Sequence, residues 1–123
     1  MTDQRRDAGE TADSVLAALS DPRRRQLLDL LAEQGEATAT TLAGRLPVSR
    51  QAVVKHLAVL DAAGLVSASR VGREVRYAVR TAAVDTTARW MAALAAGWDR
   101  RLTNIKHAAE AAERDPRPVR HDS

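Results

Sequence analysis

The chain has 123 residues with a formal net charge of +3, and 45% of its residues are hydrophobic and 28% charged, as in a single soluble domain. It has no Cys and only three aromatic residues, which excludes disulfides and thiolate metal sites and argues against a base-stacking platform for nucleic acid. No apolar run approaches the ~20 residues of a membrane span, and residues 1–7 lack the apolar core of a signal peptide, so we expect a soluble cytoplasmic protein that does not bind membranes.

The charges are unevenly distributed along the chain. Residues 45–80 contain seven Arg and Lys against two Asp and Glu, whereas residues 1–44 contain five against eight. A basic central segment is typical of proteins that bind nucleic acid, although a solvated charged surface would give the same pattern.

The first half of the chain predicts three helices. Residues 1–10 are polar and without periodicity, so we expect them to be a disordered tail before a helix over residues 11–19. The second helix has an N-cap at Asp21, Pro22 at its first position and Gly35 at its end. A third, over residues 39–46, would bury Leu42 and Leu46 and stop at Pro47.

The second half predicts a helix, a hairpin and a long helix. Ser49 is the expected N-cap of a helix that ends near Gly64 and carries three apolar residues on one face: Val53, Leu57 and Leu60. Residues 65–71 and 74–80 flank a Gly72-Arg73 turn and predict two β-strands. The long helix spans residues 85–112, and residues 113–123, with two prolines, are expected to be disordered. Its apolar stripe consists of Trp90, Leu94, Trp98, Leu102, Ile105 and Ala109.

This order of elements predicts a mainly α winged helix-turn-helix domain over residues 11–112, with about five helices and a two-stranded β-hairpin as the wing. The helix over residues 39–46 would brace the helix that begins after Ser49. A helix-turn-helix of this kind places the start of its second helix in the major groove of DNA.

Several motifs in this order resemble the ArsR/SmtB family of bacterial transcriptional repressors. They are LSDPRRRQLL (19–28), TLA (41–43), SRQAVVKHL (49–57), LDAAGLV (60–66) and RVGREVRY (70–77). The segment from Trp90 to Leu102 is similar to a subgroup often encoded beside SRPBCC proteins. The resemblance implies a homodimeric repressor, with its own operon among its candidate targets, that binds an inverted-repeat operator. One departure is that residues 37–43 contain neither Cys nor His, so thiolate metal sensing is not implied.

The candidate DNA contacts lie on the helix after Ser49 and on the hairpin. Arg50 has the donors to bind guanine, and Gln51 has the donor and acceptor to bind adenine. Arginines on the hairpin would reach phosphates or the minor groove, and His56 would either contact a phosphate or pack against the helix over residues 39–46. Arg24 matches a recurrent family arginine, and an intramolecular ion pair is an equally good role for it. The expected DNA-binding residues are Ser49, Arg50, Gln51, Val54, Lys55, His56, Arg70, Arg73 and Arg76.

The apolar stripe of the long helix predicts a homodimer, because a monomer would expose it to water. The first helix would lie alongside. The expected interface residues are Val15, Leu16, Trp90, Met91, Leu94, Trp98, Leu102 and Ile105.

Other functions have weaker support. Ser49 and His56 have no acidic partner at a useful spacing, so we expect no enzyme activity and no cofactor. His107 and Glu110 are three residues apart on one helix face, a spacing too common to predict a metal site. A winged-helix module that binds protein rather than DNA is the alternative function, and an inducer, if one exists, is unidentified.

Overall fold

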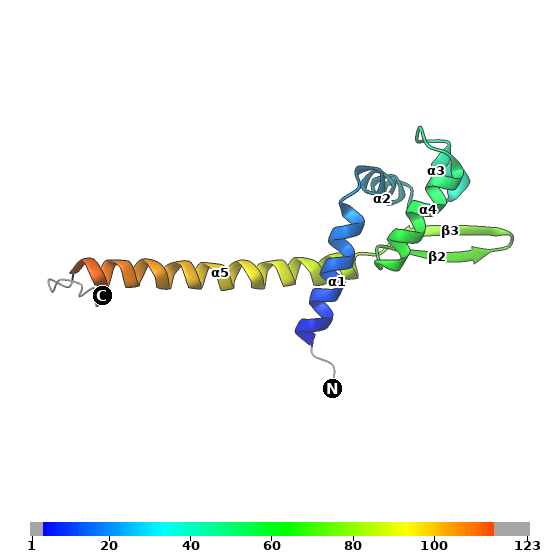
Figure 1. Ribbon diagram of the computed structural model, residues 1–123. Coiled ribbons are helices and arrows are strands. Elements are labelled where there is room, and N and C mark those ends of the chain that lie inside the picture. The colour runs from blue at the N-terminus through cyan, green and yellow to red at the C-terminus, as the bar shows by residue number, and fades with distance from the viewer. Residues whose placement is uncertain (1–3, 115–123) are drawn as a thin grey trace. The chain divides into compact units, whose positions relative to one another are not determined.

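The computed structural model describes residues 4–114, which contain five helices and one three-stranded antiparallel sheet. Figure 1 shows the helices and the hairpin formed by two of the strands. The chain divides into two units, the first ending at Trp90 and the second beginning at Met91. The elements in chain order are α1 (Gln4–Leu19), α2 (Pro22–Gln34), β1 (Ala37–Thr38), α3 (Ala39–Ala43), α4 (Arg50–Ala62), β2 (Val66–Val71), β3 (Glu74–Val79) and α5 (Ala82–Arg114).

Capping residues set the bounds of α2 and α4, as the sequence predicts. Asp21 Oδ1 accepts a hydrogen bond from the Arg23 N–H at 2.9 Å, and Ser49 Oγ accepts one from the Ala52 N–H at 3.1 Å. Gly35 ends α2 with φ +80°, a backbone conformation that glycine adopts without a Cβ clash. These capping residues were predicted correctly: Asp21 and Gly35 bound α2, and Ser49 begins α4, the second helix of the helix-turn-helix.

The expected tail over residues 1–10 is wrong from Gln4 onward, because α1 begins there. Two contacts involve residues of this additional helical segment, residues 4–10. Arg6 pairs with Glu10 at 3.6 Å, and Gly9 faces Trp90, whose Nε1 lies 3.6 Å from where a Cβ on Gly9 would stand. At the other end α5 extends through Arg114, so the first two residues of the predicted C-terminal tail are helical, and the rest lie outside the described residues.

The remaining bounds differ only slightly from expectation. Helix α3 ends at Ala43 rather than residue 46, and α5 begins at Ala82 rather than residue 85. None of the helices within residues 4–114 is long and apolar enough to cross a bilayer.

The sheet has a third strand that the sequence does not reveal. Its order is β1-β3-β2, with Ala37 opposite Tyr77 and Thr38 opposite Arg76. The predicted two-stranded wing is confirmed as the hairpin of β2 and β3, and β1 adds a third strand to the same sheet. With two residues, β1 is too short to show the alternation that identifies a strand. We call the β2–β3 hairpin, residues 66–79, the wing.

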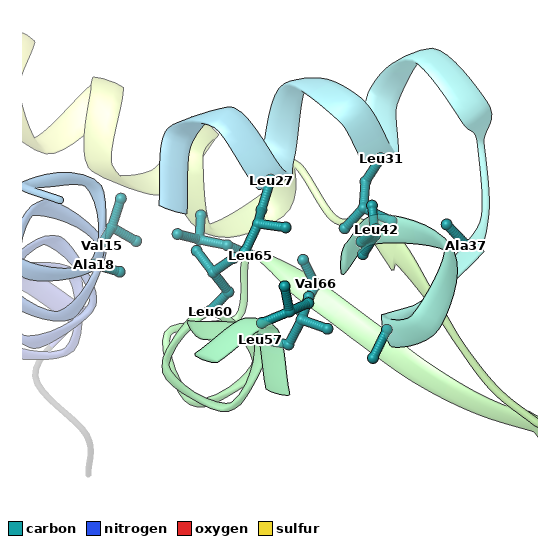
Figure 2. Packing of buried hydrophobic residues seen from close by; sticks show 12 residues of the cluster. Val15, Ala18, Leu27, Leu31, Ala37, Leu42, Leu57, Leu60, Leu65 and Val66 are labelled. Atoms are coloured by element: carbon teal, nitrogen blue, oxygen red, sulfur yellow. The ribbon is translucent and has the colours of Figure 1, made fainter. Parts of the chain in front are cut away.

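The hydrophobic core lies between α1, α2, α3, α4 and the start of β2 (Figure 2). Val53, Leu57 and Leu60 of α4 are completely buried, as their spacing predicts. Val15 is also in this core, with 1% of its surface exposed, which corrects its assignment to a dimer interface. It points toward α2 and α4 in the same chain and has no surface left for a partner.

Candidate nucleic-acid interface

Helix α4 has one buried and one exposed face. Opposite the buried Val53, Leu57 and Leu60, the side chains of four predicted contact residues are exposed to solvent: Arg50, Gln51, Val54 and Lys55. Ser49, which caps the helix, is exposed beside them. The start of α4 therefore offers cationic, amide and hydroxyl groups on a rigid helix, which are the groups that contact base edges and phosphates.

A side-chain hydrogen bond joins α3 to the start of α4. Arg50 Nε donates to Thr40 Oγ1 at 3.1 Å, across the turn of the helix-turn-helix. Thr40 was not predicted as a site residue, because no sequence pattern indicates a contact between residues ten apart in two different helices.

The exposed face of α4 continues into a cavity that the wing borders. The cavity has a volume of about 590 Å³ and lies between α3, α4 and the wing. Its lining residues are Thr38, Ala39, Thr40, Thr41, Arg50, Val54, Arg73, Glu74, Val75 and Tyr77. The structure thus brings Arg50, Val54 and Arg73, three of the predicted contact residues, to one concave surface.

The three arginines of the wing differ in their partners. Arg70 and Arg73 form no ion pair within residues 4–114, whereas Arg76 lies 3.3 Å from Glu74 Oε2 and 3.9 Å from Glu36 Oε2. A guanidinium held by two carboxylates contributes less net charge to its surroundings than a free one. Arg70 and Arg73 are therefore better placed than Arg76 to attract phosphate.

His56 is turned away from the exposed face of α4. Its side chain is only 16% exposed, and its Nδ1 lies 4.0 Å from Asp21 Oδ2 at the start of α2. This packing corrects the expected DNA contact of His56, because an imidazole held there does not reach the surface that Arg50 and Gln51 share.

Arg24 forms the intramolecular ion pair that was one of its two expected roles. Its Nη1 lies 3.4 Å from Asp21 Oδ2, and its Nε donates to the carbonyl of Ala18 at 2.6 Å. The backbone hydrogen bond from Arg23, together with the positive charge of Arg24 and the neighbouring imidazole of His56, holds the pKa of Asp21 below its ordinary value against the opposing effect of burial. Asp21 and Arg24 together thus link the end of α1, the start of α2 and helix α4.

The predicted dimer residues fall into two groups. In the first unit, Leu16 is exposed and Trp90 is half-buried next to Gly9. In the second unit, five large apolar side chains follow one another at spacings of three or four residues and are between 36% and 65% exposed. We call these five the α5 stripe: Met91, Leu94, Trp98, Leu102 and Ile105.

No group of three or more His, Cys, Asp or Glu side chains in the described part of the chain is arranged to hold a metal ion. His107 and Glu110 lie within α5, without a third ligand in residues 4–114.

Comparison with known proteins identifies the helix-turn-helix. A family of helix-turn-helix domains matches residues 19–67. The transcriptional repressor SdpR of Bacillus subtilis is 34% identical over 79 residues, which cover 64% of this chain and 87% of SdpR. The family match over residues 19–67 contains α2, α3 and α4, and it therefore includes the two helices that line the candidate interface.

Solved structures of similar fold are also those of transcriptional regulators. An ArsR-like transcriptional regulator from Rhodococcus sp. RHA1 is 48% identical, with a TM-score of 0.74 over 81% of this chain and 93% of that one. The winged helix-turn-helix domain of Mb0332 from Mycobacterium bovis is 30% identical, with a TM-score of 0.59 over 85% of this chain and 93% of that one. That domain is homodimeric and belongs to a possible ArsR-family transcriptional regulator.

The fold, the exposed start of α4 and these relatives favour DNA binding over a protein-binding module. This chain belongs to the ArsR family of winged helix-turn-helix repressors and is a DNA-binding transcriptional regulator.

Proposed function

We propose that this protein is a homodimeric repressor that binds an inverted-repeat operator and blocks access of RNA polymerase, with its own operon among its targets. It acts in the cytoplasm, by binding alone and without catalysis. The observation that carries the proposal is the two-sided character of α4, whose inner face is completely buried while Arg50, Gln51, Val54 and Lys55 are exposed.

In this proposal α4 lies in the major groove and the wing lies over the flanking backbone. Arg50 and Gln51 would contact base edges, Lys55 and Ser49 would contact base edges or phosphates, and Val54 would pack against a thymine methyl group. Arg70 and Arg73 would add phosphate contacts, which strengthen binding to every sequence equally. The cavity between α4 and the wing supports this division, because Arg50 and Arg73 line it together.

The α5 stripe supports a dimer. Soluble monomers rarely expose a continuous row of large apolar side chains, and pairing two such helices would remove both rows from water. The homodimeric state described for the M. bovis relative agrees with this. Two copies of α4 related by a two-fold axis would contact successive major grooves, about 34 Å apart.

Footprinting of the purified protein on DNA from upstream of its own gene tests the proposal. We expect two protected half-sites of inverted sequence, about one helical turn apart, and binding that weakens steeply with added salt. A single protected half-site would contradict the dimeric arrangement. Binding without any sequence preference would contradict the proposal that the protein recognises a specific operator.

A further inference from the structure

The hydrogen bond between Thr40 and Arg50 has consequences for the chemistry of Arg50. Thr40 is the second residue of α3 and Arg50 is the first residue of α4, so the bond spans the turn between the two helices. Both side chains line the cavity between α3, α4 and the wing. The bond therefore lies where DNA would approach.

A guanidinium has five N–H donors in a fixed plane, one on Nε and two on each terminal nitrogen. Thr40 Oγ1 takes the Nε donor, and the structure gives Nη1 and Nη2 no hydrogen-bond partner within residues 4–114. Guanine presents two acceptors, O6 and N7, side by side in the major groove. With Nε occupied, Arg50 can bind them in a bidentate manner only through Nη1 and Nη2.

We propose that Thr40 is a positioning residue that orients Arg50 toward a guanine and thereby sets sequence preference at a base pair that Thr40 does not touch. The proposal rests on the proposed role of Arg50 in base recognition. Threonine suits the task because its branched Cβ limits the hydroxyl to few rotamers. Holding the long arginine side chain before DNA binds removes part of the entropic cost of ordering it in the complex.

A direct phosphate contact by Thr40 is the competing explanation, because the first helix of a helix-turn-helix crosses the DNA backbone. The two roles have different consequences. A lost phosphate contact weakens binding to all sequences alike, whereas a lost positioning contact lowers the preference for one base pair.

Three variants separate these roles. Thr40→Val removes the hydroxyl with little change of shape, and Thr40→Ser retains it. Thr41→Val makes the same change at the next residue, whose hydroxyl accepts from Thr38 Oγ1 rather than from Arg50. Each is compared with the unaltered protein and in an Arg50→Ala background, after thermal unfolding has shown that the variants are folded.

The measurement is affinity for the operator and for a set of operators with each base pair substituted in turn. We expect Thr40→Val to lower the preference for one guanine by about 3- to 10-fold. Thr40→Ser and Thr41→Val should keep that preference, and Thr40→Val should have no further effect on it in the Arg50→Ala background.

Two results would overturn the role of Thr40 alone: equal weakening of all sequences by Thr40→Val, or a preference lost on Arg50→Ala but kept on Thr40→Val. A third result, an unchanged preference in Arg50→Ala itself, would overturn the assignment of Arg50 and the inference with it. The design therefore distinguishes failure of this inference from failure of the proposed base contacts.

Discussion

Nδ1 of His56, on the helix that presents the candidate DNA-binding face, lies 4.0 Å from Oδ2 of Asp21, the N-cap of α2. The same carboxylate oxygen pairs with Arg24 at 3.4 Å. Because Arg24 also donates to the carbonyl of Ala18, this cluster connects α1 and α2 to α4 at the turn between the first two helices.

The first prediction concerns the charge of Asp21. Its pKa is lowered in the folded state, so its contribution to stability is present above the ordinary value of 3.8 and is lost as the pH falls through the lowered pKa. Asp21→Asn keeps an oxygen for the cap but removes the charge, and Asp21→Ala removes both. Both should lower Tm at pH 7, Asp21→Ala by more. The difference between Asp21→Asn and the unaltered protein should shrink toward pH 3 in thermal unfolding followed by circular dichroism. A difference that is the same at pH 7 and pH 3 would contradict the charge interaction.

The second prediction compares two arginines of the wing. Arg73→Ala should weaken binding to all DNA sequences and lower the slope of log K against log salt concentration by about one. Arg76→Ala should lower the slope by less, because Glu74 and Glu36 already hold its charge. Titrations at several salt concentrations measure both slopes. A larger change for Arg76→Ala would show that its ion pairs open when DNA binds.

The third prediction concerns base recognition by α4. Arg50→Ala and Gln51→Ala should each remove about 1–3 kcal/mol of discrimination at particular base pairs, because each side chain can form two hydrogen bonds with one base. Selection from randomised operators reveals the preferred sequence of each variant. If both variants select the same sequence as the unaltered protein, the base contacts are assigned to the wrong residues.

Local sequence signals predicted the helix-turn-helix well because each is carried by one or two residues. Ser49 and Asp21 cap their helices by hydrogen bonds to nearby N–H groups, and Leu57 is buried because its spacing from Val53 and Leu60 matches one helix face. Such interactions involve residues a few positions apart, so the local sequence is enough to predict the helix ends and the buried face of α4.

Features that depend on distant contacts were not predicted. The first turns of α1 are polar, but Gly9 lies against Trp90, more than half the chain away. Val15 has the spacing of either a core or an interface residue, and only the packing of α2 and α4 around it decides for the core. The turn of His56 toward Asp21, the pairing of β1 with β3 and the bond from Arg50 to Thr40 are of the same kind.

The fourth prediction concerns metal ions. Zinc, cadmium or arsenite at modest concentration should not release operator DNA, because the chain has no Cys and residues 4–114 contain no group of three potential ligands. Release is measured by fluorescence anisotropy of labelled operator. Release by stoichiometric zinc that is lost in His107→Ala would instead identify a site at His107 and Glu110.

The fifth prediction concerns Trp98, which lies in the middle of the α5 stripe. We expect it to be buried across the dimer interface, where truncation of a tryptophan to alanine costs about 3–5 kcal/mol. Trp98→Asp should be worse, because it places an unpaired charge in an apolar contact. Neither variant alters a proposed DNA contact. Ala96→Asp is the matched control, since it adds the same charge to an exposed position on the other side of α5.

Sedimentation of Trp98→Asp, combined with operator binding, tests the central claim that dimerisation through α5 is required for recognition. We predict a folded monomer that has lost high-affinity binding to the full operator, whereas Ala96→Asp remains a dimer and binds normally. A folded, monomeric Trp98→Asp that binds the full operator as tightly as the unaltered protein would contradict the claim.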